Sequence, residues 1–161
     1  MPARVRDCRL EDLQAVCADM REDEIEQTLA LGVNDRYDAS AAAASLWRSP
    51  GPKITILDTT GAPILCGGAM EVSTGVYEGW QVATKTAWDG NWRHITRVTR
   101  WFMARMFLLG AHRMQINSLA SRRGACQWYA KGLKMTFEGI RRGYGRCGED
   151  IAEYARLRSD P

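Results

Sequence analysis

The middle of the chain contains three strand-like runs that follow one another with only short turns between them. The runs are residues 53–58 (KITILD), 63–72 (PILCGGAMEV) and 76–84 (VYEGWQVAT). The turn sequences TTGA and STG separate them, and Gly, Ser and Thr clusters of this kind mark the ends of strands. Strands joined by such short turns pair antiparallel. The sequence therefore predicts a three-stranded antiparallel meander, around which the other elements must be arranged.

A short strand and two helices are predicted before the meander. Apolar and polar residues alternate in residues 3–10 (ARVRDCRL), as expected for a first strand. Residues 11–32 then place apolar side chains on one helical face and acids on the other. Asp38 is a suitable N-cap for a second, alanine-rich helix over residues 39–49. The sequence PGP ends that helix.

A long basic helix is predicted after the meander, over residues 93–109. Its inward stripe has apolar residues spaced by three and four positions, namely Ile95, Val98, Phe102, Met106 and Leu109. Three arginines line another face, namely Arg93, Arg97 and Arg100. Gly110 then ends the helix.

The last part of the chain predicts a strand, a short helix and a hairpin. The strand covers residues 112–120, and the helix runs from a cap at Ser121 to about Gly132. Residues 134–145 and 149–158 predict two strands joined as a hairpin. The complete order is strand, two helices, three strands, helix, strand, helix and two strands.

Size and composition are those of one domain without a membrane span. The chain has 161 residues, of which 45% are apolar and 25% charged, and its apolar runs are far shorter than the ~20 residues that cross a bilayer. Its first residues lack the continuous apolar core of a secretory signal, so we expect a cytosolic protein. The five cysteines show no C-x-x-C spacing and only two histidines are present. We therefore expect buried, reduced thiols, and neither a disulfide framework nor a metal site.

The charges are divided between the two ends of the chain. Residues 1–38 contain ten acidic and five basic residues, whereas residues 93–148 contain twelve basic residues and one acid, Glu138. Such a basic region attracts a phosphorylated cofactor, nucleic acid or an acidic partner surface. A solvated arginine-rich helix face is the other interpretation.

The order of elements over nearly the whole chain resembles the GCN5-related N-acetyltransferase (GNAT) fold. RVRDCRLEDLQAV resembles its opening strand and helix, ITILDTTGAPILCGGAMEV its second and third strands, and ACQWYAKGLKMTFEGI its last helix and sixth strand. The resemblance implies one α+β domain over residues 1–161, with a mixed, mostly antiparallel sheet of about seven strands and four helices. It also implies acetyl-CoA as the cofactor. In active members the splayed fourth strand holds the pantetheine arm, and a glycine-rich loop before the next helix binds the pyrophosphate.

The cofactor would lie against the strand, loop and helix of residues 79–106. The resemblance assigns cofactor contacts to Val82, Thr84, Lys85, Gly90, Asn91, Arg93 and Arg97. The loop nevertheless departs from the family pattern Gln/Arg-x-x-Gly-x-Gly/Ala. Trp88 and Trp92 stand where small residues let the backbone approach phosphate, and Asp89 adds a like charge. The sequence therefore predicts a degenerate loop, with both tryptophans near the cleft.

The proton-transfer groups also follow from the resemblance. Tyr129 lies in the segment that supplies the general acid of active members, but Leu133 replaces the glycine of the usual Tyr-x-x-x-Gly spacing. Glu78 or Glu71 in the meander is a candidate base that would act through water. The alternatives are exposed strand carboxylates and a partly buried tyrosine whose hydroxyl reaches water.

Three shorter segments resemble the T7-like phage internal virion protein family, which has an acetyltransferase-like fold and an equally eroded loop. They are DASAAAASLWRS, APILCGGAMEV and GWQVATKTAW. This resemblance implies a role in assembling the internal core of a phage particle. It implies other virion or core proteins and self-association as partners, and a location in the host cytoplasm during infection or inside the virion.

Two further functions stay open at this point. The first is an active acetyl-CoA-dependent N-acetyltransferase that acts on a small-molecule or protein amine. The second is direct nucleic-acid binding through the basic helix.

Overall fold

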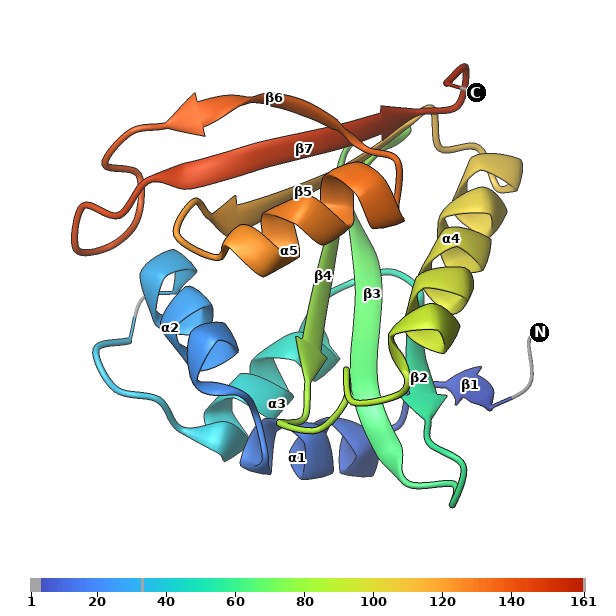
Figure 1. The fold of residues 1–161 in the computed structure, drawn as a ribbon, viewed down its shortest axis with the longest axis vertical. Coiled ribbons are helices and arrows are strands. Elements are labelled where there is room, and N and C mark those ends of the chain that lie inside the picture. Colours follow the sequence, from blue (N-terminus) through green and yellow to red (C-terminus); the bar gives the residue numbers. More distant parts are fainter. Residues whose placement is uncertain (1–3, 33, 161) are drawn as a thin grey trace.

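A seven-stranded sheet forms the centre of the computed structural model, which describes residues 4–32 and 34–160. The strand order is β1-β2-β3-β4-β5-β7-β6 (Figure 1). The strands are β1 (Val5–Asp7), β2 (Lys53–Leu57), β3 (Pro63–Ser73), β4 (Val76–Ala83), β5 (Arg113–Leu119), β6 (Thr136–Arg141) and β7 (Ile151–Leu157). All neighbours pair antiparallel except β4 and β5, which run parallel. The predicted meander is β2, β3 and β4, and the predicted hairpin is β6 and β7.

Helices pack on both faces of the sheet (Figure 1). They are α1 (Leu10–Ala18), α2 (Glu22–Leu31), α3 (Ala39–Arg48), α4 (Trp92–Leu108) and α5 (Arg123–Gln127), followed by the π-helical turn η1 (Trp128–Gly132). The neighbouring residues Leu65 and Cys66 of β3 belong to different apolar clusters, because successive strand residues point to opposite faces. Leu65 packs in the α4 cluster, and Cys66 in the α1 and α3 cluster. None of the helices in the described ranges is long and apolar enough to cross a membrane.

The segment predicted as one helix over residues 11–32 is two helices, so the described part of the chain has five α-helices instead of four. The break lies at Met20, which leaves the helix and forms a β-bridge with Thr84 beyond the end of β4. This contact buries Met20 to 2% exposure. After the break, α2 rises from α1 towards β5 (Figure 1).

The predicted cap of the last helix was wrong. The N-cap of α5 is Arg122, and Ser121 makes no capping hydrogen bond. The side chain of Arg122 instead forms ion pairs with α2. The predicted cap of α3 is confirmed, because the Asp38 carboxylate accepts a hydrogen bond from the Ala41 amide at 2.6 Å.

The long helix α4 has the predicted amphipathic character except at its last position. Ile95, Val98, Phe102 and Met106 are buried, and the three arginines of the other face are exposed. Leu109 was predicted to point inward but is 66% exposed. It lies after the end of the helix, where Gly110 adopts a φ of +115° and redirects the chain.

The five cysteines are all free thiols. Cys8, Cys17 and Cys66 are buried, as predicted, whereas Cys126 is half-buried and Cys147 is exposed. Within residues 4–32 and 34–160, no cluster of three or more His, Cys, Asp or Glu side chains is arranged to hold a metal ion.

The parallel pairing of β4 with β5 covers only one end of these strands. Residues 76–78 pair with residues 113–115. Beyond this point β4 continues to Ala83 and β5 to Leu119, and the two strands diverge (Figure 1). The space between them is a cleft lined by residues of both strands, and its two facing edges carry backbone groups that the sheet itself does not pair.

Candidate functional site

On the side of α2, two cavities lie along the cleft between β4 and β5. The first, about 240 Å³, is bordered by α2, α3 and both strands, and its lining includes Glu24, Glu78 and Tyr129. The second, about 300 Å³, lies nearer the start of α4, and its lining includes Trp88 and Trp92. Gln81 and Arg122 line both cavities.

The β4 edge of the cleft is closed by Glu24 of α2. The amide of Ala83 donates a hydrogen bond to Glu24 Oε2 at 2.6 Å. Glu24 is 4% exposed, and this burial raises its pKa to about 7, against the lowering effects of Arg122 and of the Ala83 amide. The Glu24 side chain therefore accepts a hydrogen bond from a backbone N–H group that no neighbouring strand pairs.

The β5 edge of the cleft is closed by Gln27, one turn further along α2. Gln27 Nε2 donates to the carbonyl of Asn117 at 3.1 Å, and Gln27 Oε1 accepts from the amide of Leu119 at 3.2 Å. A parallel neighbouring strand would make this same pair of bonds, to the C=O of one residue and the N–H two residues later. The side-chain amide of Gln27 thus takes the place of the backbone N–H and C=O of one residue of a neighbouring strand.

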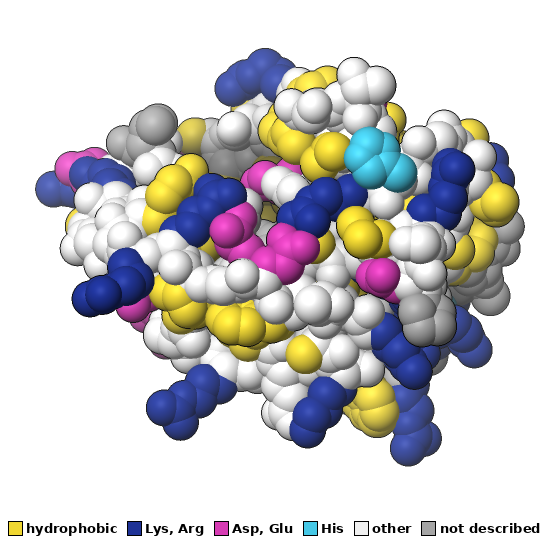
Figure 2. Space-filling view, turned by 90° about the horizontal axis from the view of Figure 1, so that it is seen from above, with side chains coloured by type: hydrophobic (Ala, Val, Ile, Leu, Met, Phe, Trp, Pro, Cys, Tyr) yellow, Lys and Arg dark blue, Asp and Glu magenta, His cyan; other side chains and the backbone are white. Residues whose placement is uncertain are grey.

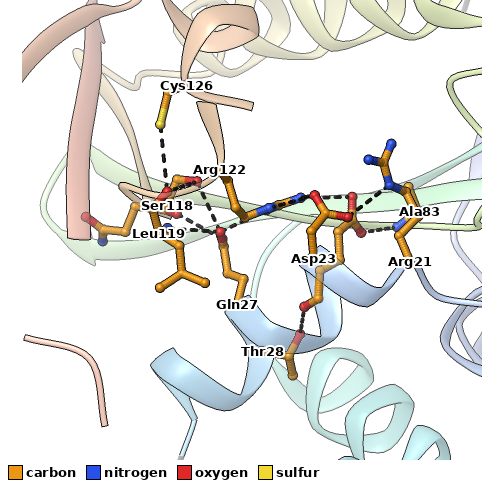
Figure 3. Close-up of polar contacts among 11 residues, drawn as sticks. Arg21, Asp23, Gln27, Thr28, Ala83, Ser118, Leu119, Arg122 and Cys126 are labelled. Atoms are coloured by element: carbon orange, nitrogen blue, oxygen red, sulfur yellow. Dashed lines mark hydrogen bonds and ion pairs between the residues drawn. The ribbon is translucent and has the colours of Figure 1, made fainter. Parts of the chain in front are cut away.

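Arg122 connects these two closures, as Figure 3 shows. Its Nη1 donates to Gln27 Oε1 at 2.8 Å, and its Nη2 lies 3.0 Å from Asp23 Oδ2 and 3.4 Å from Glu24 Oε1. The Arg122 side chain is 9% exposed. Buried ion pairs of this kind hold their geometry only when the remaining hydrogen-bonding positions are also used. Arg21 completes the group by donating to the other oxygen of Asp23 at 3.0 Å.

Sequence reasoning missed this group of residues. Asp23 and Glu24 lie in an acidic run that looks like a solvated helix face, and Gln27 has no distinguishing neighbour. Their partners are 59 to 99 positions away in the chain. No local pattern could have indicated that side chains on this face of α2 bond to the edges of β4 and β5.

The loop after β4 forms a series of turns closed by its own backbone. The amide of Ala87 donates to Thr84 and that of Asp89 to Thr86, while the amide of Lys85 donates to Asp19. The Thr84 side chain is buried, and its hydroxyl has no hydrogen-bond partner within the described ranges. These bonds occupy part of the backbone that a phosphate would need.

The start of α4 retains one feature of an anion site. No side chain caps the helix, because Asn91 Nδ2 donates to the Asp89 carbonyl and not to α4. Gly90 has a φ of +70°, and the space beside its α-carbon is open. Uncapped N-terminal amides favour an anion, but the Asp89 carboxylate beside them opposes one.

The predicted basic contacts lie outside both cavities. Lys85 Nζ is 3.6 Å from Asp19 Oδ1, and both side chains are exposed. The Arg93 guanidinium lies 5.2 Å from the centre of the Trp92 ring. Arg97 donates to His94 Nδ1 at 3.2 Å. These three side chains contact their own neighbours and do not line the cleft.

Among the other predicted cofactor contacts, Val82 lines the first cavity, whereas Thr84, Gly90 and Asn91 line neither. Trp88 and Trp92 lie near the cleft, as predicted. Trp88 also packs edge-on against Trp128, with 4.9 Å between the ring centres. The second cavity is thus walled by indole rings.

The two predicted proton-transfer residues, Tyr129 and Glu78, share the first cavity. Tyr129 is 1% exposed, and burial raises the pKa of its hydroxyl above the ordinary value of 10. It is therefore fully buried, and not partly buried as the alternative interpretation held. Glu78 accepts from Gln115 Nε2 at 3.4 Å. Glu71 lies elsewhere, exposed beside the β3–β4 turn, where it accepts from the Gly75 amide at 2.8 Å.

The splayed strands, the helix that starts at the cleft and the strand order are those of the GNAT fold. Solved structures agree over nearly the whole chain. An N-acetyltransferase from Staphylococcus aureus Mu50 has a TM-score of 0.76 at 15% identity, covering 98% of this chain and 99% of that one. Spermidine N-acetyltransferase from Vibrio cholerae, in complex with CoA and spermine, has a TM-score of 0.76 at 12% identity, covering 96% and 95%.

A third neighbour is the GNAT-superfamily phosphinothricin acetyltransferase from Sinorhizobium meliloti, in complex with acetyl-CoA. It has a TM-score of 0.70 at 17% identity and covers 98% of this chain and 89% of that one. Comparisons with models of protein families and with curated proteins find no match. The chain therefore has the α+β GNAT fold, and identities this low establish the fold alone.

Acetyl-CoA held along the β4 edge in the manner of the GNAT fold would compete with side chains of α2 for backbone groups. The Ala83 amide already donates to the Glu24 carboxylate, and Gln27 fills the opposite edge. Trp88 and Trp92 line the approach to the start of α4. A ligand that needs these backbone groups must first displace side chains of α2.

We predict that Glu24→Gln changes the pH dependence of stability. The pKa of Glu24 is raised from 4.5 to about 7 on folding, so between these values the folded wild type binds the extra proton. Its free energy of unfolding should therefore fall, relative to Glu24→Gln, by up to about 3 kcal/mol as the pH rises through this window. Denaturant unfolding at a series of pH values measures the difference.

Glu26→Gln, on the exposed face of the same helix, is the matched control and should follow the wild type at every pH. A difference between wild type and Glu24→Gln that stays constant with pH would contradict the prediction.

Proposed function

We propose that this chain uses the GNAT fold as a scaffold for assembling the internal core of a phage particle, with little or no acetyl transfer. One observation supports the part of the proposal that concerns acetyl transfer. The Glu24 carboxylate occupies the Ala83 amide, the kind of donor on the splayed strand that a cofactor carbonyl would need. A cofactor carbonyl would have to compete with the Glu24 side chain for this single N–H group.

The state of Tyr129 supports the same conclusion. A general acid works best when its pKa lies near the working pH. Burial moves the pKa of Tyr129 in the opposite direction, further from neutrality. The hydroxyl is therefore poorly suited to give up a proton to a leaving thiolate.

The outer face of the sheet supports a role in protein contacts. Figure 2 shows acidic, basic and apolar side chains close together on the face seen from above, where β6 and β7 lie. Arg113 pairs with Glu138 and Arg141 with Glu153 across these strands, and Phe137 of β6 is exposed. Because β6 ends the strand order, its outer edge is free for another chain to contact. The segment resemblance to phage internal virion proteins then suggests other core proteins or a second copy as the partner.

An active N-acetyltransferase on a small-molecule or protein amine is the second candidate. It is favoured by the shared cavity of Glu78 and Tyr129 and by the uncapped start of α4. The neighbours solved with acetyl-CoA or with CoA and spermine belong to this class of enzyme. Here Glu78 would accept a proton from the amine, and Tyr129 would donate one to the thiolate.

Calorimetric titration of the purified wild-type protein with acetyl-CoA separates the two candidates. We expect no binding heat at acetyl-CoA concentrations up to about 1 mM, because the β4 donor is occupied. An active GNAT enzyme titrated in parallel shows that the assay detects binding. A Kd on the order of 1 µM, about −8 kcal/mol, would overturn the scaffold proposal.

The assembly role predicts a particular distribution of the protein during infection. Antibody detection in purified particles and in assembly intermediates should find it in at least one of these fractions, beside the core proteins. A tailless or coreless mutant preparation serves as the control for non-specific adsorption. Absence from both fractions would contradict the assembly role, whatever the titration shows.

A further inference from the structure

We propose that α2 is a latch: Glu24 and Gln27 hold the cleft between β4 and β5 closed against the extended chain of secondary amides for which the GNAT fold provides this cleft. The proposal rests on the proposed function, because it explains why the wild-type cleft would not bind such a ligand. It goes further by assigning the closure to two named side chains.

The bonds that close the cleft are those that such a ligand would make. Gln27 donates to one backbone carbonyl of β5 and accepts from the amide two residues later. Glu24 accepts from the amide of Ala83 on the facing strand. A chain of secondary amides running between the strands offers the same donors and acceptors in the same places. The chemistry of the closed cleft therefore defines the class of ligand that could replace the helix.

Few side chains of α2 are fully buried, which makes its displacement feasible, although Ile25 packs partly buried against the apolar cluster of α1. Of its ten residues, only Glu24 and Ala30 are buried. Ala30 packs in a small apolar cluster with Leu119 and Ile151. An intramolecular hydrogen bond contributes about 1 kcal/mol net to stability. Little free energy is therefore lost when a ligand replaces α2 and makes each of its bonds again. By contrast, α1 buries Leu13, Val16 and Cys17 in the main apolar cluster on that face.

Arg122 contacts both side chains of the latch but does not depend on either of them for a counter-charge. It contacts the oxygens of both Glu24 and Gln27, but it also pairs with Asp23. Removing Glu24 therefore does not leave Arg122 without a counter-charge. Glu24 and Gln27 can therefore be replaced without leaving Arg122 as an unpaired buried cation. An unpaired buried cation would itself unfold the protein.

The test compares coenzyme A binding to wild type and to the double variant Glu24→Ala/Gln27→Ala by calorimetry. Coenzyme A is the probe because its pantetheine arm is an extended chain with two secondary amides. We expect the double variant to bind at least tenfold more tightly than the wild type. The matched control is Glu22→Ala/Glu26→Ala, which alters two exposed positions of the same helix and should bind like the wild type.

The outcomes separate the latch from the proposed function. A folded double variant that binds no better than a silent wild type would overturn the latch and leave the scaffold role standing. Micromolar binding by the wild type itself would overturn both. If circular dichroism shows that the double variant is unfolded, the single variants Glu24→Gln and Gln27→Ala replace it. Folded single variants without any gain in affinity would also overturn the latch.

Discussion

The parallel pairing of β4 with β5 stops after three residue pairs, and the rest of the molecule is arranged around the consequences. Beyond that point both strands carry inward-facing backbone groups without a strand partner. A buried, unsatisfied amide or carbonyl costs about 1 to 3 kcal/mol, so the fold must supply partners from elsewhere. It does so with α2, which reaches the cleft because α1 ends at Ala18 and Met20 then pairs with Thr84.

In this arrangement, the sheet and a ligand need hydrogen-bond partners at the same backbone groups. The groups that α2 satisfies are the groups that hold an extended amide chain along a splayed strand. The contacts of α2 therefore stabilise the fold but oppose binding of such a ligand. The raised pKa of Glu24 reflects the cost of burying a carboxylate in that position, and Arg122 offsets part of it.

Much of the fold could be predicted from the sequence because its signals are local. The meander follows from short turns between β-rich runs, and α4 follows from apolar spacing that Leu109 alone departs from. Met20 misled the prediction because its side chain suits the apolar stripe of α1 equally well; a contact with Thr84, far along the chain, decides its conformation.

The candidate site was predictable only where the fold itself positions the residues. Glu78 and Tyr129 line one cavity because a strand and a helical turn bring them there. Arg93 and Arg97 stay a prediction as cofactor contacts, because charge and position near a loop do not show where a long side chain points; in the structure each contacts a neighbour within its own helix. Glu24 and Gln27 escaped notice because their partners lie on strands that the sequence does not link to α2.

Amide hydrogen exchange at Ala83 and Leu119 tests this account most directly. Both amides lie on strand edges that no other strand pairs, and both donate to side chains of α2. If α2 closes the cleft, the two amides exchange as slowly as amides inside the β3–β4 ladder. Exchange as fast as that of the exposed turn at residues 73–75 would show that the cleft is open and would contradict the account.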